Sequence, residues 1–437
     1  MSTALVDRPA PAAPSPSGRA KLGPIRRAAE LRRTSPGRLQ LILAALLALG
    51  LLTGLVAGLT ARSANAGTAD LGNRAQPLLV EAEAIYSGLA DADTTAAQAF
   101  LAGGLEPPAL TRRYEADLAQ ATTALTSAAR RTPDGGQSAD AVAALSSGVA
   151  GYAALVATAR ADNRQGLPVG SSYLSAASLL NRQTLLPQAQ ALFGVAQREV
   201  DGGYTSARSI WWLLLFTVLL VLTVLALTIA QRYLSRTTHR TFNMPLLAAT
   251  GLVLLLALGA GSLLINQNLH LHRADVQGSK PAAELAEARI LALRERGDEA
   301  LALAAHGSGS ASEADFVSAQ SQLTASNGPL TGEYLPNEAI TAHKAYLDLH
   351  RQVRALDDGG DYDGAVKLAI AADTTKTFDT VTGDIGTALN QRKAEFTGEI
   401  DSAGQGLGLL IVVGPLLALI ACALVTVGLR ARLEEYR

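Results

Sequence analysis

The chain has 437 residues, of which 49% are hydrophobic and 17% are charged, and its formal net charge is −1. A soluble protein carries roughly 25% charged residues, so this composition indicates a membrane protein, and the near-neutral charge argues against a nucleic-acid partner. The sequence has one cysteine, which excludes disulfides within the chain, so folded domains must be held together by packing.

The N-terminal segment, residues 1–38, is rich in Pro, Ala, Ser and Arg, which predicts a disordered basic cytoplasmic tail. Arg32 and Arg33 precede Thr34-Ser35-Pro36 and could belong to a phosphorylation site beside the membrane. The favoured interpretation is that these arginines fix the topology of the first span.

Four apolar windows carry no charged residue and reach the length of about 20 residues that crosses a bilayer. A charge at the membrane centre costs roughly 2.5–3.5 kcal/mol on insertion scales, so this absence is informative. The long segment before the first window favours an uncleaved anchor over a signal peptide. We expect transmembrane helices at 39–61, 209–230, 244–265 and 407–429.

The short connections set the expected orientation. Arginines are frequent in the first tail, in the link 231–243 and in the tail 430–437, and the positive-inside rule places such segments in the cytoplasm; the residues concerned are Arg32, Arg33, Arg232, Arg236, Arg240 and Arg432. None of these segments reaches the roughly 50 residues of a domain. An inward signal would therefore pass to another protein, and these arginines are candidates for contacting it.

The segment 62–208 is expected outside the cell as an antiparallel four-helix bundle. A heptad pattern over 71–99 predicts the first helix, which Gly103-Gly104 and Pro107-Pro108 should end. Further helices are predicted over 109–131 and 139–163, and a fourth from Tyr173 onward that Pro187 should kink.

The segment 266–406 repeats this plan, with helices predicted over 286–304, 313–325, 337–356 and from Tyr362 onward. The spacing from Tyr152 to Arg160 recurs from Tyr346 to Arg354, and Asp93 and Asp298 lie alike in the two first helices. The predicted fold is therefore an all-α integral membrane protein with four transmembrane helices and two extracytoplasmic antiparallel four-helix bundles that arose by internal duplication.

No motif of a catalytic site is present, and we expect neither enzymatic activity nor a cofactor. His270-Leu-His272 could contribute to a metal site, but zinc needs three or four ligands, so interfacial polar residues are the favoured interpretation.

Four residues are candidates for binding a ligand or an extracellular partner: Arg160, Arg354, Asp357 and Asp358. The arginines could grip a carboxylate, although arginines at helix ends also stabilise the helix dipole. The two aspartates, together with Asp361 and Asp363, resemble a calcium loop but lack the residue order of an EF-hand, so a solvated turn followed by helix N-capping is favoured.

Gly50, Gly54 and Gly58 in the first span have the spacing that permits close helix packing. The sequence leaves open whether they pack within the chain or form a homo-oligomer.

Several short motifs resemble a family of actinobacterial membrane proteins of the GlnX type. These motifs are Asp91-Ala-Asp93-Thr-Thr-Ala-Ala-Gln-Ala-Phe100, Asn163-Arg-Gln-Gly-Leu-Pro-Val-Gly170, Leu356-Asp-Asp-Gly-Gly-Asp-Tyr362 and the ending Arg432-Leu-Glu-Glu-Tyr-Arg437. The resemblance extends over essentially the whole chain. It implies a membrane protein that links an external amino-acid-binding lipoprotein of the GlnH type to the cytoplasmic serine/threonine protein kinase G.

The expected function is therefore a transmembrane relay that conveys the availability of aspartate- or glutamate-type amino acids. The alternative is a non-switching envelope scaffold or a transport-accessory subunit, which would bind its partners equally with and without the amino acid.

Overall fold

The computed structural model describes residues 35–102, 106–132, 135–208, 210–238, 243–304, 309–325, 328–331 and 334–434. Helices and the turns between them make up these residues, and no strand occurs among them. The predicted all-α fold is confirmed. The chain divides into two compact units, which are described separately.

The first unit contains parts of four long apolar helices, α2 (Ser35–Asp70), α8 (Ile210–Thr238), α9 (Met244–Arg273) and α15 (Leu407–Glu434). Its core consists of aliphatic side chains from all four helices, including Leu46, Leu227, Leu246 and Val425. Because an unpaired hydroxyl is costly in an apolar environment, Thr53 and Thr223 share a hydrogen bond of 2.7 Å between their Oγ1 atoms.

Two of the three glycines predicted to allow close packing face α15 of the same chain. A Cβ atom added to Gly54 would lie 2.5 Å from Ala418 Cβ, and one added to Gly50 would lie 2.7 Å from Cys422 Sγ. These two glycines therefore serve helix packing within the chain, as their spacing allows.

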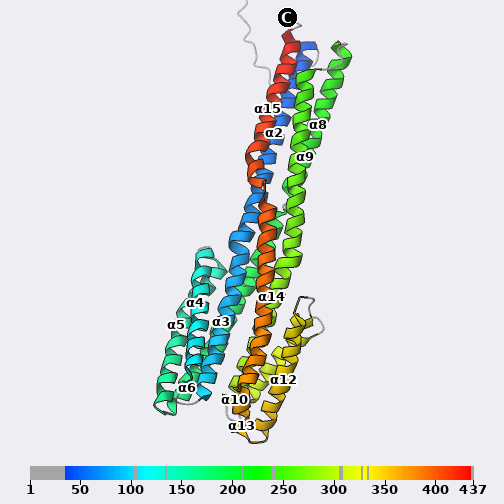
Figure 1. The fold of residues 1–437 in the computed structure, drawn as a ribbon. Helices are drawn as coiled ribbons and strands as arrows, with labels where there is room; N and C mark the ends of the chain where they lie inside the picture. Colours follow the sequence, from blue (N-terminus) through cyan, green and yellow to red (C-terminus); the bar gives the residue numbers. More distant parts are fainter. Residues whose placement is uncertain are drawn as a thin grey trace, which may run out of the picture. The chain divides into compact units, whose positions relative to one another are not determined.

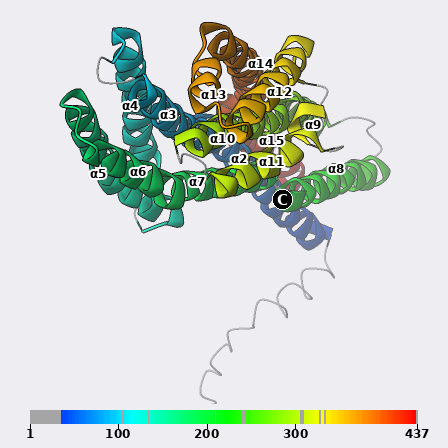
Figure 2. The same cartoon turned by 90° about the horizontal axis from the view of Figure 1, so that it is seen from below.

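The second unit consists of Ala57–Leu214 and Leu258–Val413 and contains two helical bundles (Figures 1 and 2). In bundle 1, α3 packs against α4 and α7, and α5 packs against α6 and α7. Its elements are the π-helical turn η1 (Leu71–Ala75), α3 (Gln76–Leu101), α4 (Pro108–Arg131), α5 (Gln137–Arg164), α6 (Val169–Leu180), the π-helical turn η2 (Asn181–Leu185) and α7 (Leu186–Ala207).

In bundle 2, α10 packs against α11 and α14, and α12 packs against α13 and α14. Its elements are the π-helical turn η3 (Ala274–Ser279), α10 (Lys280–Ala304), α11 (Ser310–Thr324), the short 3₁₀ helix η4 (Pro329–Thr331), α12 (Asn337–Asp358), α13 (Tyr362–Ala369) and α14 (Ala372–Gly404).

The last helix of each bundle is interrupted, in two different ways. In bundle 1 the π-helical turn η2 directly precedes Pro187, where proline was predicted to kink the helix. In bundle 2 the single helix predicted from Tyr362 is broken between α13 and α14 without glycine or proline at the break. Arg296 Nη2 donates to the Ala369 carbonyl (2.9 Å), and Thr374 Oγ1 donates to the Leu368 carbonyl (2.8 Å). These two side chains therefore provide donors for carbonyl groups in the last turn of α13.

Equivalent turns support the similarity of the two bundles. α5 and α12 each end before a glycine with positive φ, Gly166 (69°) and Gly360 (84°). In both turns the glycine N–H and the N–H of the next residue donate back to the last helical turn, which is the Schellman arrangement that favours glycine. Tyr152 and Tyr346, which occupy corresponding positions in the two segments of the sequence, are both fully buried.

Five helical stretches are long and apolar enough to cross a membrane by length and composition. Four contain the predicted windows, and the fifth is α5. On α2, α8, α9 and α15 many large apolar side chains point outward, whereas α5, which is described over its whole length, exposes none. Long apolar helices with outward-facing leucines indicate a membrane protein.

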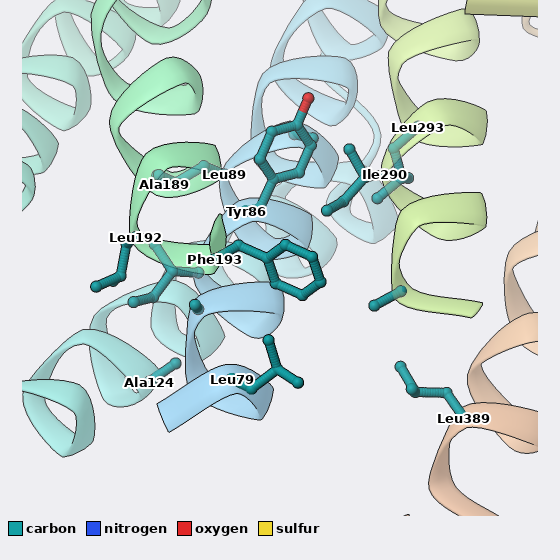
Figure 3. Packing of buried hydrophobic residues seen from close by; sticks show 14 of the residues in the cluster. Leu79, Tyr86, Leu89, Ala124, Ala189, Leu192, Phe193, Ile290, Leu293 and Leu389 are labelled. Atoms are coloured by element: carbon teal, nitrogen blue, oxygen red, sulfur yellow. The ribbon is translucent and has the colours of Figure 1, made fainter. Parts of the chain in front are cut away.

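The two bundles share one hydrophobic core. Figure 3 shows Tyr86 and Leu89 of α3 between side chains of α7, such as Phe193, and side chains of α10, such as Ile290 and Leu293. We call the contact between the bundles, formed mainly by α3 against α10 and extended by η1 against α14, the seam.

Candidate functional site

A cavity of about 290 Å³ opens at the seam. Bundle 1 contributes side chains of α3, η2 and the neighbouring ends of α6 and α7, and bundle 2 contributes side chains of α10 and α11. The charged residues that line it are Asp93, Arg182, Arg294, Asp298 and Asp315. Apolar walls are formed by Tyr86, Leu179, Leu186, Pro187 and Leu293.

Arg182 lies in η2 and connects the two bundles. Its Nη1 donates to Asp298 of α10, and its Nε lies 3.9 Å from Asp93 Oδ2 of α3. The neighbouring Asn181 is buried and donates from Nδ2 to the Leu89 carbonyl (3.1 Å), which ties η2 to α3. Asp93 of α3 and Asp298 of α10, which occupy similar positions in the first helices of the two bundles, thus lie next to the same side chain, that of Arg182.

Asp93 is buried and well supplied with hydrogen bonds. Ser178 Oγ donates to its Oδ1 at 2.9 Å and Tyr152 Oη at 3.3 Å. Burial raises the pKa of Asp93, and the charge of Arg182 and the hydrogen bonds from Ser178 and Tyr152 oppose this rise. These hydrogen bonds hold the Asp93 side chain in place at the wall of the cavity.

Asp298 is buried but only half satisfied. Its side chain is 2% exposed, and its Oδ1 accepts from Arg182. Its Oδ2 has no hydrogen-bond partner among the described residues, and Arg294 Nε lies 3.9 Å from it. Burial raises the pKa of Asp298 to about 6, against the lowering effect of Arg182 and Arg294.

Further ion pairs cross the seam. Arg289 of α10 binds Glu83 of α3 (Nη1 to Oε1, 3.1 Å), and Lys393 Nζ of α14 lies 3.7 Å from Glu83 Oε2. Arg113 of α4 makes two hydrogen bonds to Asp379 of α14, at 2.9 and 3.3 Å. The seam thus combines a shared apolar core with ion pairs, two of which involve the buried Glu83.

Arg160, predicted as a binding residue, lies in α5 and pairs within bundle 1. Its guanidinium lies 2.8 Å from Glu106 Oε2 and also donates to Thr111 Oγ1 (3.2 Å). Arg160 does not line the seam cavity, and its binding role stays a prediction.

Arg354, Asp357 and Asp358 lie together at the end of α12. Arg354 Nη1 donates to Asp357 (2.7 Å) and its Nη2 donates to Asp358 (2.5 Å). In the turn that follows, Asp361 accepts from the Gly364 N–H (3.0 Å) and caps α13, in agreement with the interpretation of this segment as a turn and N-cap. The cluster is separate from the seam cavity, and its partner binding also stays a prediction.

The predicted cytoplasmic arginines are only partly described. Arg232 and Arg236 lie at the end of α8 and are exposed. Arg32, Arg33 and Arg240 lie outside the described residues. Arg432 belongs to α15.

No group of three or more potential metal ligands occurs among the described residues. His270 Nδ1 instead lies 2.6 Å from Glu399 Oε2.

The sequence did not point to Arg182, Arg294 or Asp315. Arg182 has no motif around it, and its role depends on a π-helical turn that aims it at the other bundle. The one available signal was the similar placement of Asp93 and Asp298, which did not show that the two carboxyl groups approach the same side chain.

Residues 67–205 match the family model of the actinobacterial sensor domain. The match begins near the end of α2 and ends near the end of α7, so it covers bundle 1 and supports a sensor role for the chain. Bundle 2 lies outside the match. No curated protein and no solved structure matches the chain.

Proposed function

We propose that this protein is a transmembrane sensor relay with four spans and two extracytoplasmic bundles. The observation that carries the proposal is the match of bundle 1 to a sensor domain. Residues 35–101 are helical without interruption through α2, η1 and α3, so the expected first span continues directly into the sensor bundle. A relay needs two states only a few kcal/mol apart, and a seam with many polar contacts can supply them.

The proposed input is the availability of aspartate- or glutamate-type amino acids, presented by an external binding lipoprotein. The proposed output is a cytoplasmic serine/threonine kinase that contacts the arginine-rich cytoplasmic segments, and the relay itself catalyses no reaction. The family resemblance supports these partners. The link between the expected second and third spans is too short for a domain, which agrees with an output carried by a separate protein.

The topology can be tested with single cysteines. In a Cys422→Ala background, cysteines at the exposed positions Thr122, Ser171 and Ser235 would be treated in intact cells with a membrane-impermeant maleimide. Four spans predict labelling at 122 and 171, and labelling at 235 only after permeabilisation. If α5 were a fifth span, 122 and 171 would lie on opposite sides and only one of them would react, which would contradict the proposal.

The relay can be tested by purifying the tagged protein from native membranes with and without aspartate or glutamate. We expect co-purification of a solute-binding lipoprotein and a serine/threonine kinase, in amounts that change with the amino acid. Arg232→Ala/Arg236→Ala should reduce recovery of the kinase and leave that of the lipoprotein unchanged. Recovery of permease subunits or envelope components alone, independent of the amino acid, would replace the relay by a scaffold.

A further inference from the structure

The seam cavity has the properties of a ligand site. Its volume of about 290 Å³ lies near the lower end of the range of roughly 300–1,000 Å³ for small-molecule pockets. It combines apolar walls with a few convergent charged groups, as such pockets do. Leu179 at its edge is 54% exposed, so a ligand would bury apolar surface that now faces water.

The balance of charge indicates the sign of the ligand. The cavity is lined by three aspartates and two arginines, which leaves one negative charge when all five are ionised. Arg182 is already bound to Asp298 and lies near Asp93, so it offers little to an incoming carboxylate. Burial raises the pKa of Asp298 to about 6, so the uncompensated charge favours a cationic group at pH values above about 6.

Two carboxyl groups can receive that cation. Asp298 Oδ2 is buried in the cavity without a hydrogen-bond partner among the described residues. Asp315 of α11 lines the exposed side, has no ion-pair partner within the described part of the chain, and lies close enough for its charge to raise the pKa of Asp298. A donor placed between these two groups would satisfy the orphaned oxygen and relieve the repulsion between the charges.

The surroundings favour an organic ammonium group over a metal ion. No metal-ligand cluster occurs among the described residues, and the guanidinium groups of Arg182 and Arg294 flank Asp298, which disfavours a compact divalent cation. A primary ammonium group brings three donors, and its carbon chain could cover the leucine walls.

We propose that the seam cavity binds a small molecule through a primary ammonium group, held between Asp298 and Asp315, with the apolar part of the ligand against Leu179, Leu186 and Leu293. The ligand would contact η2 and α7 of bundle 1 and α10 and α11 of bundle 2, and its ammonium group would bind Asp298 Oδ2 while Arg182 binds Oδ1. This proposal extends the sensor relay, because it assigns the seam a direct chemical input in addition to the lipoprotein.

Three matched probes separate the contributions of the functional groups: leucine, 3-methylbutylamine, which lacks the carboxylate, and 4-methylpentanoate, which lacks the amine. Binding would be measured by calorimetry on the full-length protein in lipid nanodiscs. We expect leucine and 3-methylbutylamine to bind and 4-methylpentanoate not to bind. Binding of 4-methylpentanoate as tight as that of the amine, or no binding of the amine, would overturn the proposal.

Two variants and one control locate the site. Asp298→Asn should weaken amine binding at least tenfold, and Asp315→Asn, at an exposed position that should not affect folding, should weaken it several-fold. Asp348→Asn removes an exposed aspartate of α12 that pairs with Arg351 and should leave binding unchanged. Unchanged affinity in both cavity variants would place the amine elsewhere and contradict the proposal.

The pH dependence gives an independent check. The groups that face Asp298 are Asp93 from α3, Arg182 from η2, Arg294 on its own helix and Asp315 from α11. Because the amine needs the ionised carboxylate, its affinity should rise as pH increases through about 6, where Asp298 loses its proton. A flat profile between pH 5 and 7.5 in the wild type would contradict the role of Asp298.

The two proposals can fail separately. Amine binding that leaves the recovery of lipoprotein and kinase unchanged would establish the cavity as a site and separate it from the relay. Partner recovery that changes with aspartate or glutamate, without any binding of the amine, would support the relay and remove the seam as its input.

Discussion

The two bundles have the same order of helices but different cores. Bundle 1 has a mainly aliphatic core, in which the buried carboxyl group of Asp93 accepts hydrogen bonds from Tyr152 and Ser178. Bundle 2 buries five ionisable side chains that interact directly, here called the charged core: Glu295, Arg296, Glu299, His343 and His350. A repeated topology therefore does not require a repeated core chemistry.

The charged core explains how bundle 2 holds its broken last helix. Glu299 binds Arg296 and His350, and Arg296 also donates to the carbonyl of Ala369 at the end of α13. His350 stacks on Phe316, with 3.7 Å between the ring centroids. Buried ion pairs add little net stability compared with apolar packing, so we infer that this network mainly fixes the register of α10 against α12 and α13.

The largest expected effect comes from breaking this network. Arg296→Ala leaves Glu299 Oε1 and the Ala369 carbonyl without their donor and should cost about 3–5 kcal/mol, as for other buried pairs that lose one partner. Hydrogen exchange of α10–α14 in the full-length protein would measure the loss. Arg351→Ala, which removes a guanidinium from a pair exposed on α12, is the control and should have no measurable effect.

The two bundles also differ in how closely their helices pack around glycine residues. A Cβ atom at Gly88 of α3 would lie 2.8 Å from the Asp117 carbonyl and 3.0 Å from Ala121 N of α4, so Gly88→Ala should destabilise bundle 1 by about 1–3 kcal/mol through overpacking. Gly383 of α14 has open space around it, and Gly383→Ala should stabilise bundle 2 by roughly 0.5–1 kcal/mol. Thermal unfolding of both variants checks the pair, and equal shifts would contradict the difference in packing.

The charged core should also make bundle 2 sensitive to pH. Burial alone would lower the pKa of His350, but the hydrogen bond and charge of Glu299, with the charge of Glu313, raise it overall. A group whose pKa is raised by folding adds stability below its unfolded pKa of about 6.5, and this stability is lost as pH rises through the folded pKa. Protection of α12 should therefore fall as pH increases above about 6.5, and His350→Gln should remove that component. An unchanged pH profile in the variant would exclude His350 as its source.

The smallest expected effect is at the edge of the seam. Arg113 and Asp379 are 35% and 44% exposed, so solvent screens their pair, and Arg113→Gln should cost no more than about 1 kcal/mol. The loss should shrink further at high salt. Unfolding at low and high ionic strength measures it, and a loss of several kcal/mol would show that this pair, and not the apolar centre, holds the bundles together.

Local signals in the sequence predicted most helix ends. Pro108 begins α4, and Gly166 and Gly360 follow the ends of α5 and α12, because proline and glycine act on the backbone within a few residues. The break between α13 and α14 has no such residue. It depends on Arg296, a side chain more than 70 positions earlier, and no local pattern reports such a contact.

The candidate site was less predictable than the fold for the same reason. Arg160 and Arg354 end similar motifs and were predicted to bind a ligand or partner, yet each pairs with acidic residues of its own bundle. Arg182 carries no motif, and its contact with Asp298 joins residues of different bundles through packing at the seam. Periodicity shows which face of a helix is buried but not which other helix will cover that face.

The π-helical turns have a consequence for the phase of the helices. A π-helical turn holds one residue more than an α-helical turn, and one residue corresponds to about 100° of rotation around the helix axis. η1 and η3 each introduce such an offset just before the first helix of a bundle, and in each a glycine backs closely onto α14, Gly72 against Ile400 and Gly278 against Phe396. Converting either turn to regular α-helix would rotate the residues on one side of the turn relative to those on the other. Torsion is thus a degree of freedom built into the first helix of each bundle.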